Sequence, residues 1–351
     1  MEKIRHMLIS PDITVKQAMK KMDESAEKIV FAVNESGVLV GCVTDGDMRR
    51  YILKGLPLGG NVSKVLNISP ITITEGATKK SARELMVSKS VECLPVVDLN
   101  GKIVSAMRWR DLFDGKKQTA VLKGVPVVIM AGGTGSRLSP ITNFLPKPLI
   151  PIGDKPIIEK IMEKFSAFGC RDFSISVNFK ANILKAYFSE LKHDFRIRYA
   201  QEKKPLGTIG SLQLLKKQLA KPFFVSNCDI IIEADYADIY ASHVASKNDI
   251  TLVVSMKHYT IPYGICEMGI NGKFKGIAEK PEYDFLVNTG LYVMSPSVLK
   301  DIPVDKLYHA THLIADYLKR SKKVGVYPIS ENSWFDMGEW QEMNRMLKRF
   351  G

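Results

Sequence analysis

The sequence predicts an α/β protein in which a doubly wound, mostly parallel sheet follows two copies of a smaller module. Two observations predict this fold. Residues 101–112 repeat the pattern of residues 37–48 at an offset of 64 positions. Beyond residue 119, apolar strand segments alternate with helical segments, which is typical of a parallel sheet covered by helices on both faces. A chain of 351 residues is long enough for two domains with separate cores, and we place them at 1–118 and 119–351.

Each N-terminal repeat has the pattern helix, strand, turn, strand, helix. In the first repeat, apolar residues of segment 15–22 recur near helical spacing, and two short apolar strands flank the turn 34–37. The second repeat uses the turn 98–101 in the same way. Asn- and Asp-rich turns that end in glycine indicate hairpins. We therefore expect two half-modules, 1–60 and 61–118, that pack against each other.

The second region is expected to alternate strands and helices up to about residue 262. The expected strands are 125–131, 173–177, 196–200, 223–226 and 250–254. The expected helices are 156–168, 182–191, 209–219 and 236–246. Short strands over 264–268, 274–278 and 287–294 should follow, and then helices over 309–318 and 339–350. The strand at 125–131 is apolar throughout, as expected of a strand buried on both faces.

The chain is basic, since 50 lysines and arginines against 37 acidic residues give a net charge of +13. Such an excess favours phosphate-bearing partners, including nucleic acids and nucleotides. The excess is spread as +5 over 1–118 and +8 over 119–351, and no helix-turn-helix, zinc-finger or RNA-binding motif is present. The densest basic stretch, 319–323, falls at a predicted helix end, where a solvated charge cluster is expected. We therefore expect no nucleic-acid partner.

The apolar runs and the cysteines indicate in which cellular compartment the protein is expected. No apolar run approaches about 18 residues, so we expect no membrane partner. The start of the chain, 1–6, lacks the apolar core of a secretion signal. No two of the five cysteines are close in sequence, and none has zinc-binding spacing with histidine. We expect reduced, mostly buried thiols in a cytoplasmic protein.

A glycine-rich loop follows the first strand of the predicted sheet, where residues 131–138 read Ala-Gly-Gly-Thr-Gly-Ser-Arg-Leu. Glycines there let backbone N–H groups approach a phosphate closely. The loop has neither the Lys-Ser/Thr ending of a Walker A motif nor the spacing of a dinucleotide-binding fingerprint. Arg137 lies in the loop, and Lys147 lies between two prolines that stiffen its segment. Together these features predict a clamp for a triphosphate.

These residues resemble the sugar-1-phosphate nucleotidylyltransferases, also called NDP-sugar pyrophosphorylases. The signature of that family is A-G-G-x-G-x-R-L-x-P-x-T, followed by K-P-x-x-P. The chain matches it from Ala131 to Leu138 and at Pro140, Thr142, Lys147, Pro148 and Pro151. Further family landmarks follow in order: Leu206–Ser211 (LGTIGS), Asn227–Asp229 (NCD), Glu279–Pro281 (EKP), Asn288–Tyr292 (NTGLY) and Trp334–Gly338 (WFDMG). The resemblance runs from about residue 125 to the C-terminus and implies a Rossmann-like transferase fold.

The resemblance implies a role for each matched position. Arg137 and Lys147 would be catalytic and would stabilise charge on the triphosphate. The implied nucleotide-binding residues are Ala131, Gly132, Gly133, Thr134, Gly135, Ser136, Gln201, Gly207 and Thr208. The implied sugar-phosphate-binding residues are Gly264, Glu279, Lys280 and Asn288. Asp229 and Asp336 would bind Mg²⁺, the expected cofactor, because this hard ion prefers carboxylate oxygens. Cys228 replaces the glycine that is more common before the acid, and we interpret it as a small buried residue.

The implied reaction is attack by a sugar-1-phosphate on the α-phosphorus of a nucleoside triphosphate, with release of pyrophosphate. The nucleophile is already an anionic oxygen, so no strong base is required. The difficulty lies in bringing two polyanions together, and positioning and cations therefore carry most of the catalysis. A non-catalytic nucleotide sensor is the alternative of another class. It predicts erosion of the clamp, whereas Arg137, Lys147, Asp229 and Asp336 are all present.

The residues leave the base open. Gln201 or Glu202 could read the N1–H and 2-amino donors of guanine, whereas backbone groups near Gly132 and Gly207 could serve uracil or thymine. The whole chain, with its N-terminal pair before the transferase, resembles guanylyltransferases of bacterial legionaminic-type acid pathways. That resemblance favours GTP and glucosamine-1-phosphate. Mannose-1-phosphate with GTP, and glucose-1-phosphate with UTP or dTTP, are the alternatives.

The N-terminal repeats resemble a pair of CBS domains, named after cystathionine β-synthase. Segment 41–49 resembles the G-h-h-T-x-x-D-h motif, whose threonine and aspartate contact the phosphate and ribose of adenine nucleotides in that family. Thr44 and Asp47 match in the first repeat; in the second, Asp111 matches but Arg108 replaces the threonine. The resemblance implies a regulatory nucleotide and, because CBS pairs often dimerise, a homo-oligomer. A purely structural or dimerising module is the alternative.

Overall fold

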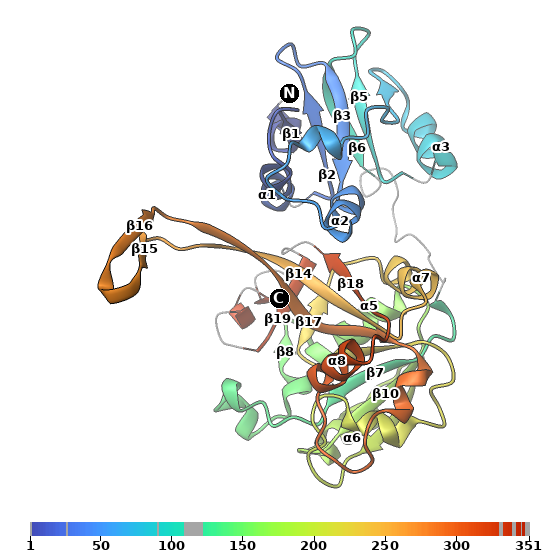
Figure 1. The fold of residues 1–351 in the computed structure, drawn as a ribbon. Coiled ribbons are helices and arrows are strands. Elements are labelled where there is room, and N and C mark those ends of the chain that lie inside the picture. The colour runs from blue at the N-terminus through green and yellow to red at the C-terminus, as the bar shows by residue number, and fades with distance from the viewer. Residues whose placement is uncertain are drawn as a thin grey trace. The chain divides into compact units, whose positions relative to one another are not determined.

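The computed structural model describes residues 2–25, 27–89, 91–108, 122–329, 333–338, 342–344 and 346–347. The chain divides into two compact units, residues 1–118 and 119–351 (Figure 1). Along the described part of the chain, no helix has both the length and the apolar character needed to cross a bilayer. All five cysteines are free; three are buried, Cys93 is half-buried and Cys266 is exposed.

The first unit contains two copies of one α/β arrangement. The first copy comprises η1 (Glu2–Met7), β1 (Leu8–Ile9), α1 (Val15–Ser25), β2 (Ile29–Val33), β3 (Leu39–Thr44), α2 (Asp45–Leu53) and η2 (Val62–Lys64). The second copy comprises β4 (Ile73–Thr74), α3 (Lys79–Lys89), β5 (Cys93–Val97) and β6 (Ile103–Arg108). In each copy, a short parallel strand lies beside an antiparallel hairpin. The hairpin turns end at Gly37 and Gly101, whose φ values are +80° and +76°, and this confirms the repeat and both predicted hairpins.

The two copies are joined by backbone hydrogen bonds and by a shared core. The Leu39 N–H donates to the Gly101 carbonyl at 3.0 Å, and the Ile103 N–H donates to the Gly37 carbonyl at 3.1 Å. Ile103 of the second copy is buried together with Phe31 of the first copy. The predicted packing of the two half-modules is therefore confirmed.

The second unit is built on a seven-stranded sheet with the order β11-β10-β7-β12-β17-β14-β18. Its strands are β7 (Val127–Ala131), β10 (Asp172–Val177), β11 (Arg196–Gln201), β12 (Phe223–Asn227), β14 (Ile250–Thr260), β17 (Glu282–Met294) and β18 (Val324–Ile329). β17 is antiparallel to both of its neighbours, and every other adjacent pair is parallel. The sheet is mostly parallel, as predicted.

Helices and small antiparallel ribbons surround this sheet. The α-helices are α5 (Ile157–Ser166), α6 (Ala181–Glu190), α7 (Tyr236–Ser246) and α8 (Ala310–Lys319). The ribbons pair β8 (Pro151–Ile152) with β9 (Lys155–Pro156), β13 (Ile230–Ile232) with β19 (Trp334–Asp336), and β15 (Ile265–Met268) with β16 (Phe274–Ala278). The 3₁₀ helices are η4 (Ser136–Leu138), η5 (Ile141–Asn143), η6 (Lys147–Leu149), η7 (Gly210–Leu215), η8 (Ile270–Gly272) and η9 (Pro296–Lys300).

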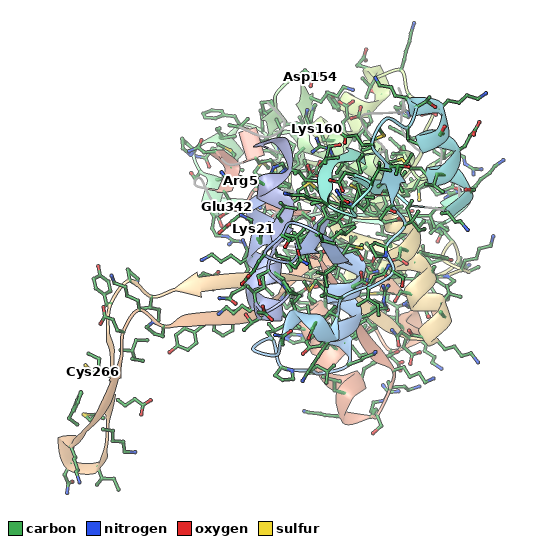
Figure 2. The ribbon with its side chains drawn as sticks, turned by 90° about the horizontal axis from the view of Figure 1, so that it is seen from above. Arg5, Lys21, Asp154, Lys160, Cys266 and Glu342 are labelled. Atoms are coloured by element: carbon green, nitrogen blue, oxygen red, sulfur yellow. The ribbon has the colours of Figure 1, made fainter. Side chains whose placement is uncertain are left out.

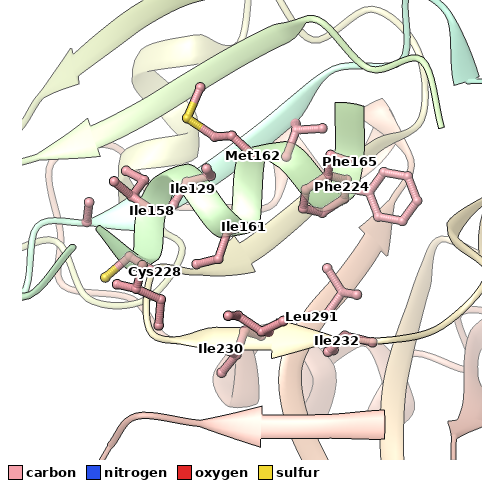
Figure 3. Close-up of a cluster of buried hydrophobic side chains, with 14 of the residues drawn as sticks. Ile129, Ile158, Ile161, Met162, Phe165, Phe224, Cys228, Ile230, Ile232 and Leu291 are labelled. Carbon is pink, nitrogen blue, oxygen red and sulfur yellow. The ribbon is translucent and has the colours of Figure 1, made fainter. Parts of the chain in front are cut away.

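The central strand β7 is buried on both faces, as its continuous apolar sequence predicts. Val127 and Ile129 belong to one hydrophobic cluster, whereas Val128 between them belongs to a second cluster. This follows from the alternation of side chains along a strand. In the first cluster, Phe165 of α5 packs against Phe224 of β12 with ring centroids 5.2 Å apart (Figure 3). The candidate site lies at the end of this rigid strand.

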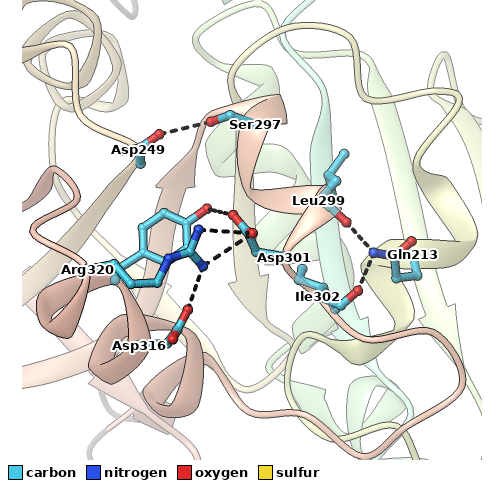
Figure 4. A network of polar contacts seen from close by, with 9 residues as sticks. Gln213, Asp249, Ser297, Leu299, Asp301, Ile302, Asp316 and Arg320 are labelled. Atoms are coloured by element: carbon cyan, nitrogen blue, oxygen red, sulfur yellow. Dashed lines mark hydrogen bonds and ion pairs between the residues drawn. The ribbon is translucent and has the colours of Figure 1, made fainter.

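Two predicted elements are wrong in type or length. Segment 209–219 was expected to be an α-helix, but it forms only the 3₁₀ helix η7. Tertiary contacts override its helical pattern: a Cβ at Gly210 would lie 2.9 Å from the Lys306 carbonyl oxygen, and the Gln213 side chain donates to the carbonyls of Leu299 and Ile302 (Figure 4). The strand expected over 287–294 begins at Glu282. Most of the helix expected over 339–350 lies outside the described residues.

The extra length of β17 belongs to a projecting ribbon. Only Ile250–Ser255 of β14 pairs with β18, and only Leu291–Met294 of β17 pairs with β12. Farther out, among the described strands, β14 and β17 pair with each other from Met256–Leu286 to Thr260–Glu282, and β15 and β16 continue the ribbon. We call residues 256–286 the arm. Figures 1 and 2 both show it projecting from the body of the second unit, and Figure 2 shows Cys266 on it.

Candidate active site

The glycine-rich loop leaves the carboxyl end of β7 and wraps around Lys147. Ala131 is the last residue of β7, and Gly135 has φ +68°, a conformation that favours glycine. A Cβ at Gly135 would lie 2.9 Å from Thr142 Cγ2 and 3.2 Å from Lys147 Cβ. The Thr142 hydroxyl donates to the Gly135 carbonyl at 3.0 Å. Gly135 therefore allows Lys147 to pack directly beneath the loop.

The other residues of the glycine-rich loop differ in how closely the rest of the chain packs against them. Gly133, Thr134 and Ser136 are exposed, and no protein atom lies within 4 Å of the position that a Cβ would take at Gly133. A Cβ at Gly132, in contrast, would lie 2.8 Å from the Glu202 carboxylate. The backbone at Gly133 thus borders open space, as a phosphate-binding loop requires.

Lys147 and Asp229 form an ion pair at the end of this loop. The Lys147 ammonium donates to the Asp229 carboxylate, and the two side chains are 10% and 15% exposed. Asp229 lies between β12 and β13, whereas Lys147 opens η6, so the pair joins segments 82 residues apart. Cys228 is buried, as expected, and its burial raises the pKa of the thiol to about 12.

Asp336 is brought beside Asp229 by the small ribbon of β13 and β19. Asp336 pairs with Ile230 in that ribbon, and the Met337 N–H donates to the Asp229 carbonyl at 2.8 Å. Burial, and after it the neighbouring Asp229 charge, raise the pKa of the Asp336 carboxyl, which comes to about 6. The Gly338 N–H, at 2.6 Å from Asp336 Oδ1, opposes this rise, as do the cations Lys147 and Arg137. The charges of the two predicted catalytic cations, Arg137 and Lys147, and of the predicted metal ligand Asp229 therefore all act on the other predicted metal ligand, Asp336.

Glu202, one of the two candidates for base recognition, joins the loop to the segment around Leu206. The Glu202 carboxylate is 6% exposed; it accepts from the Ser176 hydroxyl at 2.5 Å and from the Leu206 N–H at 3.1 Å. Its neighbour Gln201, the predicted nucleotide-binding residue, is exposed and accepts from Lys185 at 2.8 Å. Gln201 is the exposed last residue of β11, whereas Glu202 follows the strand directly and is buried.

Gly207 and Thr208 have structural partners of their own. Gly207 has φ +80°, and a Cβ there would lie 2.6 Å from the Tyr308 carbonyl oxygen. The Thr208 hydroxyl accepts from the Ala310 N–H, the first residue of α8, at 2.9 Å. These contacts fix the LGTIGS segment against the start of α8, so both residues hold the loop in place.

The predicted sugar-phosphate residues are divided between the sheet and the arm. Asn288 lies where β17 joins the sheet, and it donates to the Tyr292 hydroxyl at 2.7 Å. Gly264, Glu279 and Lys280 all lie on the arm, where a Cβ at Gly264 would be 2.9 Å from Glu279 Oε2. Lys280 has φ +43°, an uncommon conformation for a lysine. Figure 1 shows the arm, which carries these three residues, projecting from the body of the second unit.

The predicted CBS nucleotide contacts are engaged within the first unit. Thr44 caps α2: the Asp47 N–H donates to the Thr44 hydroxyl at 3.2 Å, and the Asp47 carboxylate accepts from the Thr44 N–H at 2.9 Å. This is a capping box, the structural alternative for these residue types. Arg108 pairs with Glu27 at 2.5 Å and so links the second copy to the first. Asp111 lies outside the described residues.

The basic stretch at the end of α8 is partly neutralised. Arg320 pairs with Asp316 at 2.8 Å and with Asp301 at 3.3 Å, and the Tyr317 hydroxyl donates to Asp301 at 2.6 Å (Figure 4). Arg320 therefore interacts with carboxylates of its own chain, in line with the charge cluster expected at this helix end.

A glycine loop, two cations and two carboxylates at the carboxyl edge of a mostly parallel sheet form the kind of arrangement in which α/β proteins bind phosphates. The nucleotidyl transferase family model matches residues 126–349, and the chain belongs to this family. The CBS domain model matches residues 4–54 and 62–115.

Curated relatives match about half of the chain. A mannose-1-phosphate guanyltransferase of Schizosaccharomyces pombe is 38% identical over 187 residues, which is 50% of this chain and 51% of that protein. The mannose-1-phosphate guanylyltransferase catalytic subunit beta of Drosophila melanogaster is 34% identical over 196 residues, 53% of this chain and 52% of that protein. The chain thus spans about half the length of the curated relatives it matches.

Among solved structures, HddC from Yersinia pseudotuberculosis is similar, with a TM-score of 0.52 and 25% identity. The match covers 65% of this chain and all of that one. It supports the Rossmann-type fold of the second unit.

Proposed function

We propose that this protein transfers a nucleotidyl group from a nucleoside triphosphate to a sugar-1-phosphate and releases pyrophosphate. The observation that carries the proposal is the Lys147–Asp229 ion pair beside Asp336, at the end of a glycine loop whose Gly133 borders open space. A lysine and two carboxylates at the edge of the sheet where phosphate would bind suit a reaction between two polyanionic substrates. Family membership and the names of the relatives support the same activity.

The residues of the chain act by binding the phosphates and neutralising their negative charge. Backbone N–H groups of the glycine loop bind the triphosphate, and Arg137 and Lys147 neutralise it as charge moves onto the leaving pyrophosphate. The attacking group is a phosphate oxygen of the sugar phosphate, and it forms the new bond to the α-phosphorus as the bond to the pyrophosphate oxygen breaks. No protein base is needed, because this oxygen is already anionic at neutral pH.

The residues fit a divalent magnesium ion. Asp229, just before β13, and Asp336, in the paired strand β19, offer carboxylate oxygens, and the described residues contain no group of three metal-ligating side chains. This donor set suits Mg²⁺, which is usually held by one or two carboxylates together with substrate phosphates. When bound, the ion would neutralise phosphate charge during the transfer.

We propose GTP as the nucleotide. The buried Glu202 carboxylate already accepts two hydrogen bonds, and each of its oxygens retains a second acceptor position for the N1–H and 2-amino donors of guanine. The relatives named as mannose-1-phosphate guanyltransferases support the same base. For the sugar, their names favour mannose-1-phosphate, whereas the fusion of a CBS pair to a transferase favours glucosamine-1-phosphate.

A pyrophosphate-release screen tests the function. The full chain is assayed with Mg²⁺ and each of GTP, UTP, dTTP, CTP and ATP against glucosamine-, mannose- and glucose-1-phosphate. We expect the highest turnover with GTP, and a large loss in Asp229→Asn. The Asp235→Asn variant is the matched control, because Asp235 caps α7 instead. Absence of turnover with every pair would refute the proposal.

We also propose that the CBS pair binds an adenine nucleotide. Support comes from the match of the CBS model and from the capping box, which places Thr44 and Asp47 together at the N-terminus of α2. Calorimetry with AMP, ADP and ATP on the full chain tests this, with Asp47→Asn as the variant. Equal heats for the wild type and this variant would leave the capping box as the sole role of Asp47.

A further inference from the structure

Lys180 has a backbone conformation that is uncommon for a lysine. It lies between β10 and α6 with φ +52° and ψ +33°, in the left-handed region. β10 pairs with β7, so Lys180 is at the same edge of the sheet as the glycine-rich loop. It occupies the N-cap position of α6, but its side chain makes no capping hydrogen bond there. A strained residue of this kind persists where contacts with its surroundings hold it, and the side chain of Lys180 supplies such contacts.

The Lys180 ammonium reaches the segment that follows the glycine-rich loop. It donates to the Asn143 carbonyl at 2.5 Å and to the Thr142 carbonyl at 3.3 Å. It also lies 5.2 Å from the centre of the neighbouring Phe179 ring. Both carbonyls belong to the end of η5, and carbonyls at the end of a helix lack partners within it, so a lysine ammonium suits them. Lys180 therefore ties η5 to the start of α6.

Close contacts continue from η5 to Lys147. Thr142 is buried, and its hydroxyl donates to the Gly135 carbonyl at 3.0 Å. The backbone of Gly135 lies against both neighbours, since a Cβ there would be 2.9 Å from Thr142 Cγ2 and 3.2 Å from Lys147 Cβ. Groups packed this closely cannot move independently. A displacement of Thr142 is therefore passed to the glycine-rich loop and to Lys147.

Resting on the proposed function, we propose that Lys180 is a positioning residue for the transfer. Its ammonium holds Thr142 and the glycine-rich loop in the arrangement in which Lys147 meets the triphosphate. Lys180 acts through backbone carbonyls of its own chain and not by contact with a substrate. A reaction that depends on the placement of cations is sensitive to such support, because a shift of about 1 Å can lower the rate about 100-fold.

Three substitutions at Lys180 distinguish this role from a general effect on stability. Lys180→Met removes the ammonium and keeps the backbone strain, whereas Lys180→Gly removes both. We expect kcat with GTP to fall about tenfold in each, with less than about a threefold change in the KM for GTP. Urea unfolding should show that Lys180→Gly is the more stable of the two. Lys180→Arg keeps a donor with a positive charge and should retain kcat within about threefold of the wild type. A merely structural role would instead make kcat follow stability.

Lys247 provides the matched control. It is another lysine in the left-handed conformation, with φ +50°, and it is the exposed C-cap of α7. Lys247→Gly should be more stable than Lys247→Met, for the same reason as at Lys180. Both Lys247 variants should retain the kcat of the wild type.

Hydrogen exchange measures the same contact without substrate. The N–H groups of segment 138–145 form several short-range hydrogen bonds within the loop and η5. Mass spectrometry of the full chain follows their exchange. We expect this segment to exchange about tenfold faster in Lys180→Met and at the wild-type rate in Lys247→Met.

The outcomes separate the two proposals. If the wild type is active, a wild-type kcat in Lys180→Met would overturn the positioning role, and so would losses of kcat that follow stability across the three variants. Unchanged exchange of segment 138–145 in Lys180→Met would overturn it as well. A wild type that turns over no pair of substrates, combined with faster exchange in Lys180→Met, would refute the proposed function and leave Lys180 as the residue that holds the loop.

Discussion

The Lys147 ammonium and the Asp229 carboxylate form a mostly buried ion pair that joins the glycine loop to the end of β12. Removal of one partner from such a pair leaves an unpaired charge in a poorly hydrated place, whereas removal of both does not. The pair therefore contributes both to the stability of the second unit and to the charge of the site.

A double-mutant cycle tests this pair. We expect Asp229→Asn and Lys147→Met each to lower the free energy of unfolding by about 2–3 kcal/mol, and the double variant to lose less than the sum. Urea unfolding measures all four proteins. The exposed pair of Lys155 and Glu163 is the control, and it should show no measurable coupling. Additive losses at Lys147 and Asp229 would contradict the coupling.

Gly133 should tolerate a side chain in the absence of substrate and not in its presence. No protein atom lies within 4 Å of the added Cβ, so we expect Gly133→Ala to change the free energy of unfolding by less than about 0.5 kcal/mol. Loss of a close backbone contact to phosphate should raise the KM for the triphosphate about tenfold. Gly59→Ala is the control, since the space around Gly59 is also open. An unchanged KM would remove Gly133 from the phosphate site.

Local signals predicted the elements that depend on local interactions. The helix α7 begins and ends at the predicted residues 236 and 246, and Asp235 caps it by accepting from the Ala237 and Asp238 N–H groups. Segment 209–219 failed for the opposite reason, since its close contacts are with the distant residues Lys306, Leu299 and Ile302.

The sequence motifs identify candidate residues for the site, but they do not show how those residues are arranged in space. Nothing in the spacing of Lys147 and Asp229 shows that they touch, because the contact depends on the order of strands in the sheet. The resemblance named both residues, and the structure supplied their ion pair. The arm could not be predicted, since its apolar residues have the same pattern as strands that a core covers.

His243 should make stability depend on pH. It is 1% exposed, and burial lowers its pKa to about 4 from an ordinary value of 6.5. The unfolded chain therefore binds a proton below pH 6.5 that the folded chain does not bind until about pH 4. We expect stability to fall as the pH drops through this window, by up to about 1.4 kcal/mol per pH unit.

Urea unfolding between pH 4 and pH 7.5 measures this dependence. His243→Gln should flatten it while keeping a hydrogen bond to Thr251 or Ser295, which lie 2.8 Å and 3.1 Å from the ring nitrogens. His193→Gln, at an exposed position, should keep the wild-type slope. A wild-type slope in His243→Gln would assign the dependence to other groups.

We expect Glu202 to determine the preference of the site for GTP over UTP. Glu202→Gln keeps the shape of the side chain but replaces an acceptor by a donor, which opposes the N1–H and 2-amino donors of guanine. We expect kcat/KM for GTP to fall about 30-fold, the cost of one hydrogen bond to a charged group, with less than about a threefold change for UTP. Gln201→Ala, at the neighbouring exposed position, is the matched control, and it should leave the preference for GTP unchanged. Equal losses for GTP and UTP would show that Glu202 only positions the loop through Ser176 and Leu206, and that another group reads the base.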